Sequence, residues 1–239
     1  MQYDVGSFRK DAESMGISLS EEQIGQFLRY YEMLVEWNGR MNLTAITEYK
    51  DVLKKHFVDS LSLIKVFDLR QGCSLIDVGT GAGFPGLALK IAFPGLKVTL
   101  LDSLNKRIQF LEAVIGELGI RGAETVHGRA EDSARDGRFR ESFDLCVSRA
   151  VAHLSALSEY CLPFVKKGGL CVAYKSEKAA LELEEAGKAI SLLGGRIKEK
   201  AEFTLPDSDI YRSLFVIQKT ERTPGKYPRK AGLPSKEPL

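Results

Sequence analysis

The sequence has no long hydrophobic run and no large charge of either sign. No apolar stretch in its 239 residues approaches the roughly 20 residues that span a bilayer. The first residues also lack the charged-then-apolar order of a secretion signal. The formal net charge is only +2, so any affinity for nucleic acid must come from local patches. These absences predict a soluble, cytoplasmic protein with no membrane partner.

The sequence also lacks paired cysteines. Its four cysteines, Cys73, Cys146, Cys161 and Cys171, form no CxxC motif, and three of them lie inside apolar runs. We therefore expect structural thiols and no metal site. There is no internal repeat, and nothing in the sequence requires more than a monomer.

The hydrophobic content predicts one principal core with appendages. We expect a helical N-terminal extension over residues 1–70, an α/β core over 71–220 and a basic tail over 221–239. In the extension, Ser20 and Gln23 form a candidate capping box. The helix that follows is expected to end near Asn38-Gly39, and a second is expected from about Thr47 to Lys65.

Beyond Gly72, short apolar runs alternate with helix-like segments, which is typical of a mostly parallel sheet with helices on both faces. A charged helix is expected from Lys178 to Leu193, and a turn at Pro206-Asp207 predicts that the last two strands form an antiparallel hairpin. Seven strands are expected, at residues 74–78, 97–101, 123–127, 143–147, 169–174, 196–203 and 213–218.

A glycine loop follows the first of these strands. Gly79, Gly81 and Gly83 permit positive φ and let backbone amides approach a ligand closely. Ligands of open α/β sheets bind at the carboxyl ends of such strands. However, residues 81–86 also satisfy the dinucleotide pattern GxGxxG, and a plain tight turn needs the same glycines. The loop alone does not separate S-adenosylmethionine from NAD.

Two acidic residues help to decide between these cofactors. Asp102 closes the next strand, where a carboxylate accepts both ribose hydroxyls of an adenosine-containing cofactor. Glu131 follows the third strand, where nucleoside methyltransferases commonly bracket the adenine ring. A solvated loop carboxylate remains a second interpretation of Glu131. Together the two residues favour a Rossmann-like methyltransferase fold that binds S-adenosylmethionine.

Several strings in one order resemble the RsmG family, also called GidB, whose members methylate N7 of a guanine in the 16S ribosomal RNA of the bacterial small subunit. The resemblance runs almost from end to end. It implies contacts to S-adenosylmethionine from Gly79, Phe84, Ala130, Glu131 and Arg149; Asp102 is added from its place at the strand end. The strings occupy residues 37–38, 42–46, 56–61, 77–86, 101–103, 106–107, 128–131, 148–152, 175 and 227–234.

The chemistry that the resemblance implies needs no general base, because guanine N7 carries an unprotonated lone pair near neutral pH. We therefore expect positioning residues rather than acid–base catalysts. His56, Asp59 and Ser60 lie at spacings of three and four and are candidates to face the guanine. Without the resemblance, capping or hydrogen bonding on the helix surface is the favoured interpretation. Arg149 suits a carboxylate or phosphate, or a salt bridge at the rim.

The expected partner is 16S rRNA or the small ribosomal subunit. Arg222, Lys226, Arg229 and Lys230 make the tail a candidate RNA-binding segment, and its removal is expected to impair RNA methylation more than cofactor binding. Further candidate cations are Lys54, Lys55, Lys106, Arg107, Arg129 and Lys236. Candidate stacking partners for an unpaired base are Phe84, Trp37 and Tyr227.

Two rival functions fit parts of the sequence. An NAD-dependent oxidoreductase fits GxGxxG and Asp102, although the sequence shows no convincing acid for hydride transfer. A noncatalytic ribosome-assembly factor that keeps the fold would bind the cofactor without transferring a methyl group.

Overall fold

A single seven-stranded sheet organises the chain in the computed structural model, which describes residues 3–149, 151–176 and 180–239. The strand order is β3-β2-β1-β4-β5-β7-β6, and only β7 runs against its neighbours. The sheet is therefore mixed but mostly parallel. Its strands are β1 (Ser74–Val78), β2 (Lys97–Asp102), β3 (Ala123–His127), β4 (Phe143–Arg149), β5 (Val165–Lys175), β6 (Gly195–Thr204) and β7 (Tyr211–Lys219).

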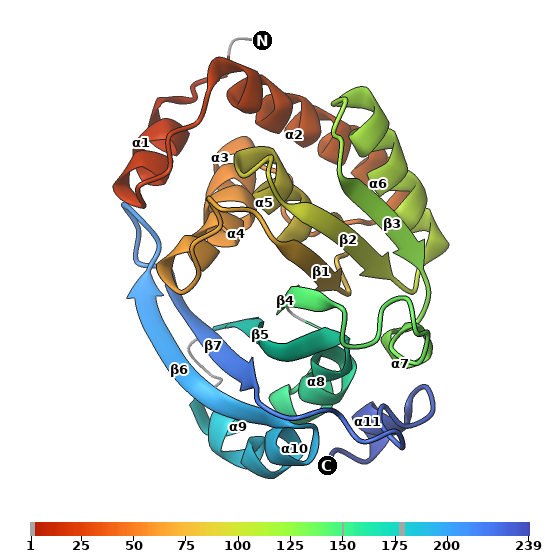
Figure 1. Cartoon of the computed structure of the whole chain (residues 1–239). Helices are drawn as coiled ribbons and strands as arrows, with labels where there is room; N and C mark the ends of the chain where they lie inside the picture. The colour runs from red at the N-terminus through yellow and green to blue at the C-terminus, as the bar shows by residue number, and fades with distance from the viewer. Residues whose placement is uncertain (1–2, 150, 177–179) are drawn as a thin grey trace.

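Helices cover both faces of this sheet, and Figure 1 shows α1 and α2 at the opposite end of the molecule from α9, α10 and α11. Before the sheet lie α1 (Gly6–Ser14), α2 (Glu21–Met41), α3 (Tyr49–Val52), the π-helix η1 (Leu53–Val58), α4 (Asp59–Leu61) and the 3₁₀-helix η2 (Ser62–Lys65). Later come α5 (Gly86–Ala92), α6 (Asn105–Glu117), α7 (Ala130–Ser133), α8 (Leu154–Cys161), η3 (Leu162–Phe164), α9 (Ala180–Glu185), α10 (Gly187–Leu192) and α11 (Leu233–Lys236).

Alternation along the strands divides the core into two layers, because successive strand residues point to opposite faces. In β4, Leu145 and Val147 join the cluster that packs under the N-terminal helices, α5 and α6, whereas Cys146 joins the cluster under α8 and α10. In β7, Val216 and Ile217 divide in the same way. The functional residues at the strand ends thus project from a sheet that is fixed on both sides.

The segments expected to be helical are helical, but their ends and their continuity differ from the prediction. The capping box of Ser20 and Gln23 is present, yet α2 continues past Asn38-Gly39 to Met41 and ends at Asn42, which is left-handed (φ 50°). The short helix α1 was not expected, and the second helix is interrupted by a π-turn. The expected helix over Lys178–Leu193 is two helices, α9 and α10, while Lys178 and Ala179 lie outside the described residues.

The terminal hairpin is confirmed, with β6 antiparallel to β7 around a turn in which Asp207 has a φ of 48°. In the described ranges, no helix combines the length and apolar character that a membrane crossing requires. The segment after β7 folds back over α8 rather than extending into solvent (Figure 1).

Candidate active site

One pocket, of about 360 Å³, lies at the carboxyl ends of β1, β2 and β3. It brings together four residues that the sequence assigns to the cofactor, namely Gly79, Asp102, Ala130 and Glu131. The remaining lining residues are Val78, Leu101, Ser103, Arg107, Gly128, Arg129, Val151, Tyr160, Gly232 and Ser235. We call this the strand-end pocket. Its place agrees with the rule that open α/β sheets bind ligands at strand carboxyl ends.

Asp102 is 2% exposed and is held firmly by neighbouring donors. Its carboxylate accepts the amide protons of Gly81 (2.9 Å) and Leu104 (2.9 Å), and it pairs with the Arg107 guanidinium at 3.1 Å. The Arg107 Nε is buried and has no hydrogen-bond partner among the residues that the structure describes. An unpaired buried donor on a pocket residue is unusual and fits a site that is completed by a polar ligand.

Glu131 lies in the first turn of α7 and is 6% exposed. Its Oε1 accepts the backbone N–H of Gly232 at 2.8 Å, so a residue of the C-terminal segment meets it across the pocket. This contact counts against the interpretation of Glu131 as a solvated loop carboxylate. No local pattern in the sequence indicates the Gly232 contact, because 101 residues separate the two positions.

The three glycines of the loop, Gly79, Gly81 and Gly83, have different surroundings. Gly79 has a φ of 71° and approaches Val151 so closely that a Cβ would lie 2.6 Å from the Val151 side chain. Gly81 has a φ of 61° and open space around it, and its N–H is directed at Asp102. Gly83 does not line the strand-end pocket; its α-carbon faces Tyr30, Leu111 and other buried side chains. Packing alone thus explains why residue 83 is a glycine, and its assignment to the cofactor stays a prediction.

We predict that Gly83→Ala destabilises the fold by about 3 kcal/mol, because the new methyl would overlap the Tyr30 hydroxyl at a φ of 97°. Gly81→Ala is the matched control: it carries the left-handed strain without a clash and should cost about 1 kcal/mol. Urea unfolding of both variants measures the difference. Equal losses would show that backbone strain, and not packing against α2, makes Gly83 necessary.

A second pocket, of about 390 Å³, lies beside the first. Arg149 at the end of β4 lines it, whereas Val151, two residues later, lines the strand-end pocket. The end of β4 thus separates the two. The other lining residues are Ile46, Lys55, His56, Asp59, Tyr174, Lys175, Ser176 and Arg212. We call this the basic pocket.

Arg149 is held within the basic pocket by Asp59. Its Nη1 donates to Asp59 Oδ2 at 2.7 Å and to the Lys55 carbonyl at 3.1 Å, while Arg212 Nε donates to Asp59 Oδ1 at 2.8 Å. Asp59 is only 2% exposed, so one buried carboxylate is shared by two cations and neutralises the charge of one of them. The resemblance placed Arg149 at the cofactor, but it does not line the strand-end pocket. Its observed role is a salt bridge at the edge of the neighbouring pocket.

His56 stacks on Phe84 with ring centroids 4.6 Å apart. Burial, followed by the nearby Arg149 charge, lowers the pKa of His56 to about 4, so the ring is neutral at neutral pH. Tyr30 also stacks on Phe84, and the Arg149 guanidinium lies 5.3 Å from the centroid of the Phe84 ring. Phe84 is 5% exposed and lines neither pocket, and its roles as a cofactor contact or a base-stacking partner stay predictions.

Ser60 does not face either pocket. It is fully buried, its hydroxyl donates to the His56 carbonyl, and its own carbonyl accepts the Tyr174 hydroxyl. Ser60 is therefore corrected from a guanine-side candidate to a helix-internal hydrogen bond. Trp37 is half-buried, packs against Phe110 with ring centroids 5.7 Å apart, and lines neither pocket, so its role in stacking on a base stays a prediction.

Asp77 at the end of β1 supports the glycine loop from below. Its Oδ2 accepts the Thr80 hydroxyl and the Gly86 N–H, and its Oδ1 is buried without a partner. Burial raises the pKa of Asp77 to about 6 in spite of these hydrogen bonds. Asp77 therefore fixes the loop that forms the floor beside the strand-end pocket.

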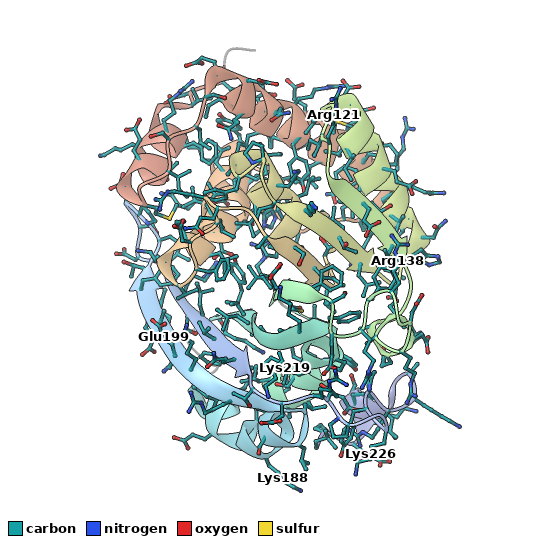
Figure 2. The ribbon with its side chains drawn as sticks, viewed as in Figure 1. Arg121, Arg138, Lys188, Glu199, Lys219 and Lys226 are labelled. Atoms are coloured by element: carbon teal, nitrogen blue, oxygen red, sulfur yellow. The ribbon has the colours of Figure 1, made fainter. Side chains whose placement is uncertain are left out.

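The tail cations differ in exposure. Arg222, Lys226 and Lys230 are exposed, and Figure 2 shows Lys226 at the outer edge of the molecule. Arg229 instead forms two-pronged hydrogen bonds to Glu159, which is fully buried. Binding of RNA by these four residues stays a prediction, and for Arg229 the structure provides a structural role. Tyr227 is 6% exposed, so it is not a free stacking surface.

The three cysteines from apolar runs meet inside the core. The sulfur atoms of Cys146, Cys161 and Cys171 lie within 4.8 Å of one another, and all three residues are buried. Their spacing in sequence gave no sign of this, because Cys146 and Cys171 are neighbours only through the pairing of β4 with β5. The expectation of structural thiols without a metal stays a prediction.

Sequence reasoning missed part of each pocket. The position of Arg212 is accessible from the sequence, because Arg212 directly precedes the apolar run of β7. Strand β7 is antiparallel to β5, so β7 begins at the edge of the sheet where β5 ends. The register pairs Ser213 with Lys175 and so brings Arg212 to the basic pocket. Tyr160 and Ser235 offer no comparable signal, since only the docking of the tail brings them to the strand-end pocket.

The fold matches that of solved methyltransferases. A methyltransferase from Pyrococcus furiosus has a TM-score of 0.56 and 16% identity, with 84% of this chain and all of that chain covered. TYW2 of M. jannaschii, solved in complex with AdoMet, has a TM-score of 0.53 and 14% identity, with 74% of this chain and 79% of that chain covered. The chain therefore has the Rossmann-like methyltransferase fold.

The family is defined by sequence. Residues 23–211 match the family GidB, described as rRNA small subunit methyltransferase G. The ribosomal RNA small subunit methyltransferase G of Lachnoclostridium phytofermentans is 54% identical over 99% of this chain and 98% of its own length. The protein of that name from Alkaliphilus metalliredigens is 52% identical over 95% of both chains. The chain belongs to this methyltransferase family.

Proposed function

We propose that this protein transfers the methyl group of S-adenosylmethionine to N7 of a guanine in 16S rRNA of the small ribosomal subunit. The observation that carries the proposal is the pair of pockets on either side of the end of β4. One presents carboxylates and a glycine loop, and the other presents cations. Family membership supports the same reaction, since its described members are small-subunit rRNA methyltransferases.

The strand-end pocket fits S-adenosylmethionine. Asp102 and Glu131 offer acceptors for the hydroxyl and amino groups of an adenosine, and Gly79 lets backbone approach closely. Arg107 carries an unpaired buried donor, which suits a polar ligand. When bound, S-adenosylmethionine supplies an electrophilic methyl group on a sulfonium centre. For Asp102 to accept hydrogen bonds from the ligand, the ion pair between Arg107 and Asp102 has to loosen.

The basic pocket is the proposed guanine site. Lys55 and Arg212 lie where RNA phosphates would approach, and neutral His56 adds no charge beside the base. Because N7 attacks with its own lone pair, the chain's residues position the ring rather than remove a proton. Such positioning supplies roughly 7 to 11 kcal/mol when the reacting atoms are held in line.

Asp59 has an electrostatic role in this proposal. The methylated guanine is cationic, so an uncompensated arginine beside N7 would raise the barrier. Asp59 offsets the charges of Arg149 and Arg212 through two short ion pairs. The pocket can therefore present guanidinium donors to the RNA while opposing the developing positive charge less than two unpaired arginines would.

Further parts of the proposal are a cytoplasmic monomer, the absence of a resident metal, and a division into an N-terminal extension (1–70), a core (71–220) and a tail (221–239). The core cluster under the sheet includes Phe27 of α2 and Leu87 of α5, so the extension packs directly on the core. Size-exclusion chromatography with light scattering tests the monomer.

The test is transfer of labelled methyl from S-adenosylmethionine to small subunits from cells that lack this protein, followed by mapping of the modified base. We expect N7-methylguanine at a single site. Subunits from cells that contain the protein are the control, because their site is already filled and should accept little label.

Two other outcomes separate the rivals. Binding of S-adenosylmethionine without incorporation into subunits, precursor particles or naked 16S rRNA would favour an assembly factor. Tight binding of NAD without binding of S-adenosylmethionine would favour an oxidoreductase. Isothermal titration with both cofactors decides the second case.

A further inference from the structure

The C-terminal segment forms part of the wall of the strand-end pocket. Gly232 and Ser235 line this pocket together with Tyr160 of α8. Figure 1 shows α11 beside α8, and contacts between these two helices agree with that view. The matched family region ends at residue 211, so the segment lies outside it.

The segment is anchored at several points. The backbone carbonyls of Thr223 and Tyr227 accept from the Arg140 guanidinium at 2.9 and 3.0 Å. Arg229 pairs with the buried Glu159 at 2.8 Å. Charge-assisted pairs of this kind hold geometry better than single neutral hydrogen bonds. The segment is thus fixed before it reaches the pocket.

Beyond Arg229, two contacts join the segment to the pocket itself. The hydroxyls of Tyr160 and Ser235 lie 2.6 Å apart, and Gly232 N–H donates to Glu131 Oε1 at 2.8 Å. A backbone donor cannot change rotamer, so it fixes the orientation of the Glu131 carboxylate. Glu131 remains a pocket-lining residue in this arrangement.

We propose that residues 231–239 are a cofactor-binding element, which closes the strand-end pocket and orients Glu131 toward the adenosine. The inference rests on the proposed use of S-adenosylmethionine. It reverses the expectation drawn from composition, in which removal of the tail affects RNA methylation more than cofactor binding. Loss of the element should weaken the cofactor site first.

The first experiment compares the full chain with one that ends at Lys230. This truncation keeps Arg229 and its pair with Glu159 but removes Gly232 and Ser235. We expect the affinity for S-adenosylmethionine, measured by calorimetry without RNA, to fall at least tenfold. The melting temperature without cofactor reports on the fold. Equal affinity of both chains would overturn this inference alone, whereas no binding by the full chain would overturn the proposed function as well.

A point variant covers the case in which the truncation loses its fold. Gly232→Ala strains a backbone with a φ of 82° in open space and should displace the N–H that Glu131 accepts. Gly168→Ala is the matched control, with a φ of 90°, open space and a place outside both pockets. We expect about fivefold weaker binding for Gly232→Ala and unchanged binding for Gly168→Ala. Equal affinities would contradict the inference.

Hydrogen exchange provides a readout independent of both affinity and activity. Saturating S-adenosylmethionine should slow exchange in peptides that contain residues 231–239, because the ligand would hold the segment closed. Peptides from α10, at Gly187–Leu192, should not change. Unchanged exchange at 231–239 would show that the segment does not contact the bound cofactor.

Discussion

Replacing Asp59 with asparagine should lower the rate of methyl transfer about 100-fold, while the affinity for S-adenosylmethionine changes less than twofold. Asparagine keeps the shape but removes the charge that compensates Arg149 and Arg212. Two cations would then face the positive charge that develops on the guanine. A 100-fold loss corresponds to about 2.7 kcal/mol of barrier, which is below the roughly 4 kcal/mol of two charges 4 Å apart near a protein surface.

The control for Asp59→Asn is Asp11→Asn. Asp11 is also buried and pairs with Lys54 at 2.5 Å, but it lines neither pocket. Both variants should lose some stability, and only Asp59→Asn should lose turnover at saturating cofactor.

The charge explanation has a further consequence. Adding Arg212→Met to Asp59→Asn removes one uncompensated cation and should restore part of the turnover. A merely structural role for Asp59 predicts no such recovery. Single-turnover measurements at saturating small subunits distinguish the two, because loss of an Arg212 contact to phosphate then affects binding and not the rate of methyl transfer. A double variant that is slower than Asp59→Asn at saturation would refute the electrostatic argument.

The sheet and the strand-end pocket are accessible from the sequence because their signals are local. Runs such as Leu75–Val78 alternate toward two packed faces, and the carboxyl end of each parallel strand must lie on one edge. Asp102 and Glu131 could therefore be assigned to one pocket from their place at strand ends. The antiparallel terminal hairpin is accessible for the same reason, because its turn residues, Pro206 and Asp207, are adjacent in the sequence.

The choice between neighbouring pockets was not accessible in this way. Arg149 was expected near the mouth of the site, and it does lie at the end of β4. The side into which its guanidinium points depends on Asp59, which lies 90 residues earlier in the chain. The surroundings of Phe84 are not accessible either, since its stacking on His56 and Tyr30 depends on how the helices pack.

The tail is the largest departure from what its composition suggests. Residues rich in proline, glycine and lysine or arginine cannot bury enough apolar surface to fold alone. Here the tail is ordered by contacts with residues outside it, above all Glu159 and Arg140. A basic residue in such a segment is thus a structural anchor when it pairs with a buried carboxylate elsewhere in the fold. No pattern within the segment predicts this pairing.

Arg229→Ala is accordingly expected to destabilise the whole protein by about 3–5 kcal/mol. Glu159 is fully buried, and removal of its partner leaves an uncompensated charge in the core. The melting temperature should fall by about 10 °C, since 1 kcal/mol shifts it by roughly 2–4 °C in a chain of this size. Lys230→Ala is the matched control, because Lys230 is an exposed cation next in sequence and its loss should leave the melting temperature unchanged.

A second substitution separates the buried charge from other effects of Arg229. Glu159→Gln combined with Arg229→Ala removes both charges, so the double variant should be more stable than Arg229→Ala alone. If Arg229 served RNA binding only, its removal would leave the melting temperature intact and weaken RNA binding with a reduced salt dependence. Thermal unfolding without RNA therefore decides between an anchor and a phosphate contact, and the buried position of Glu159 favours the anchor.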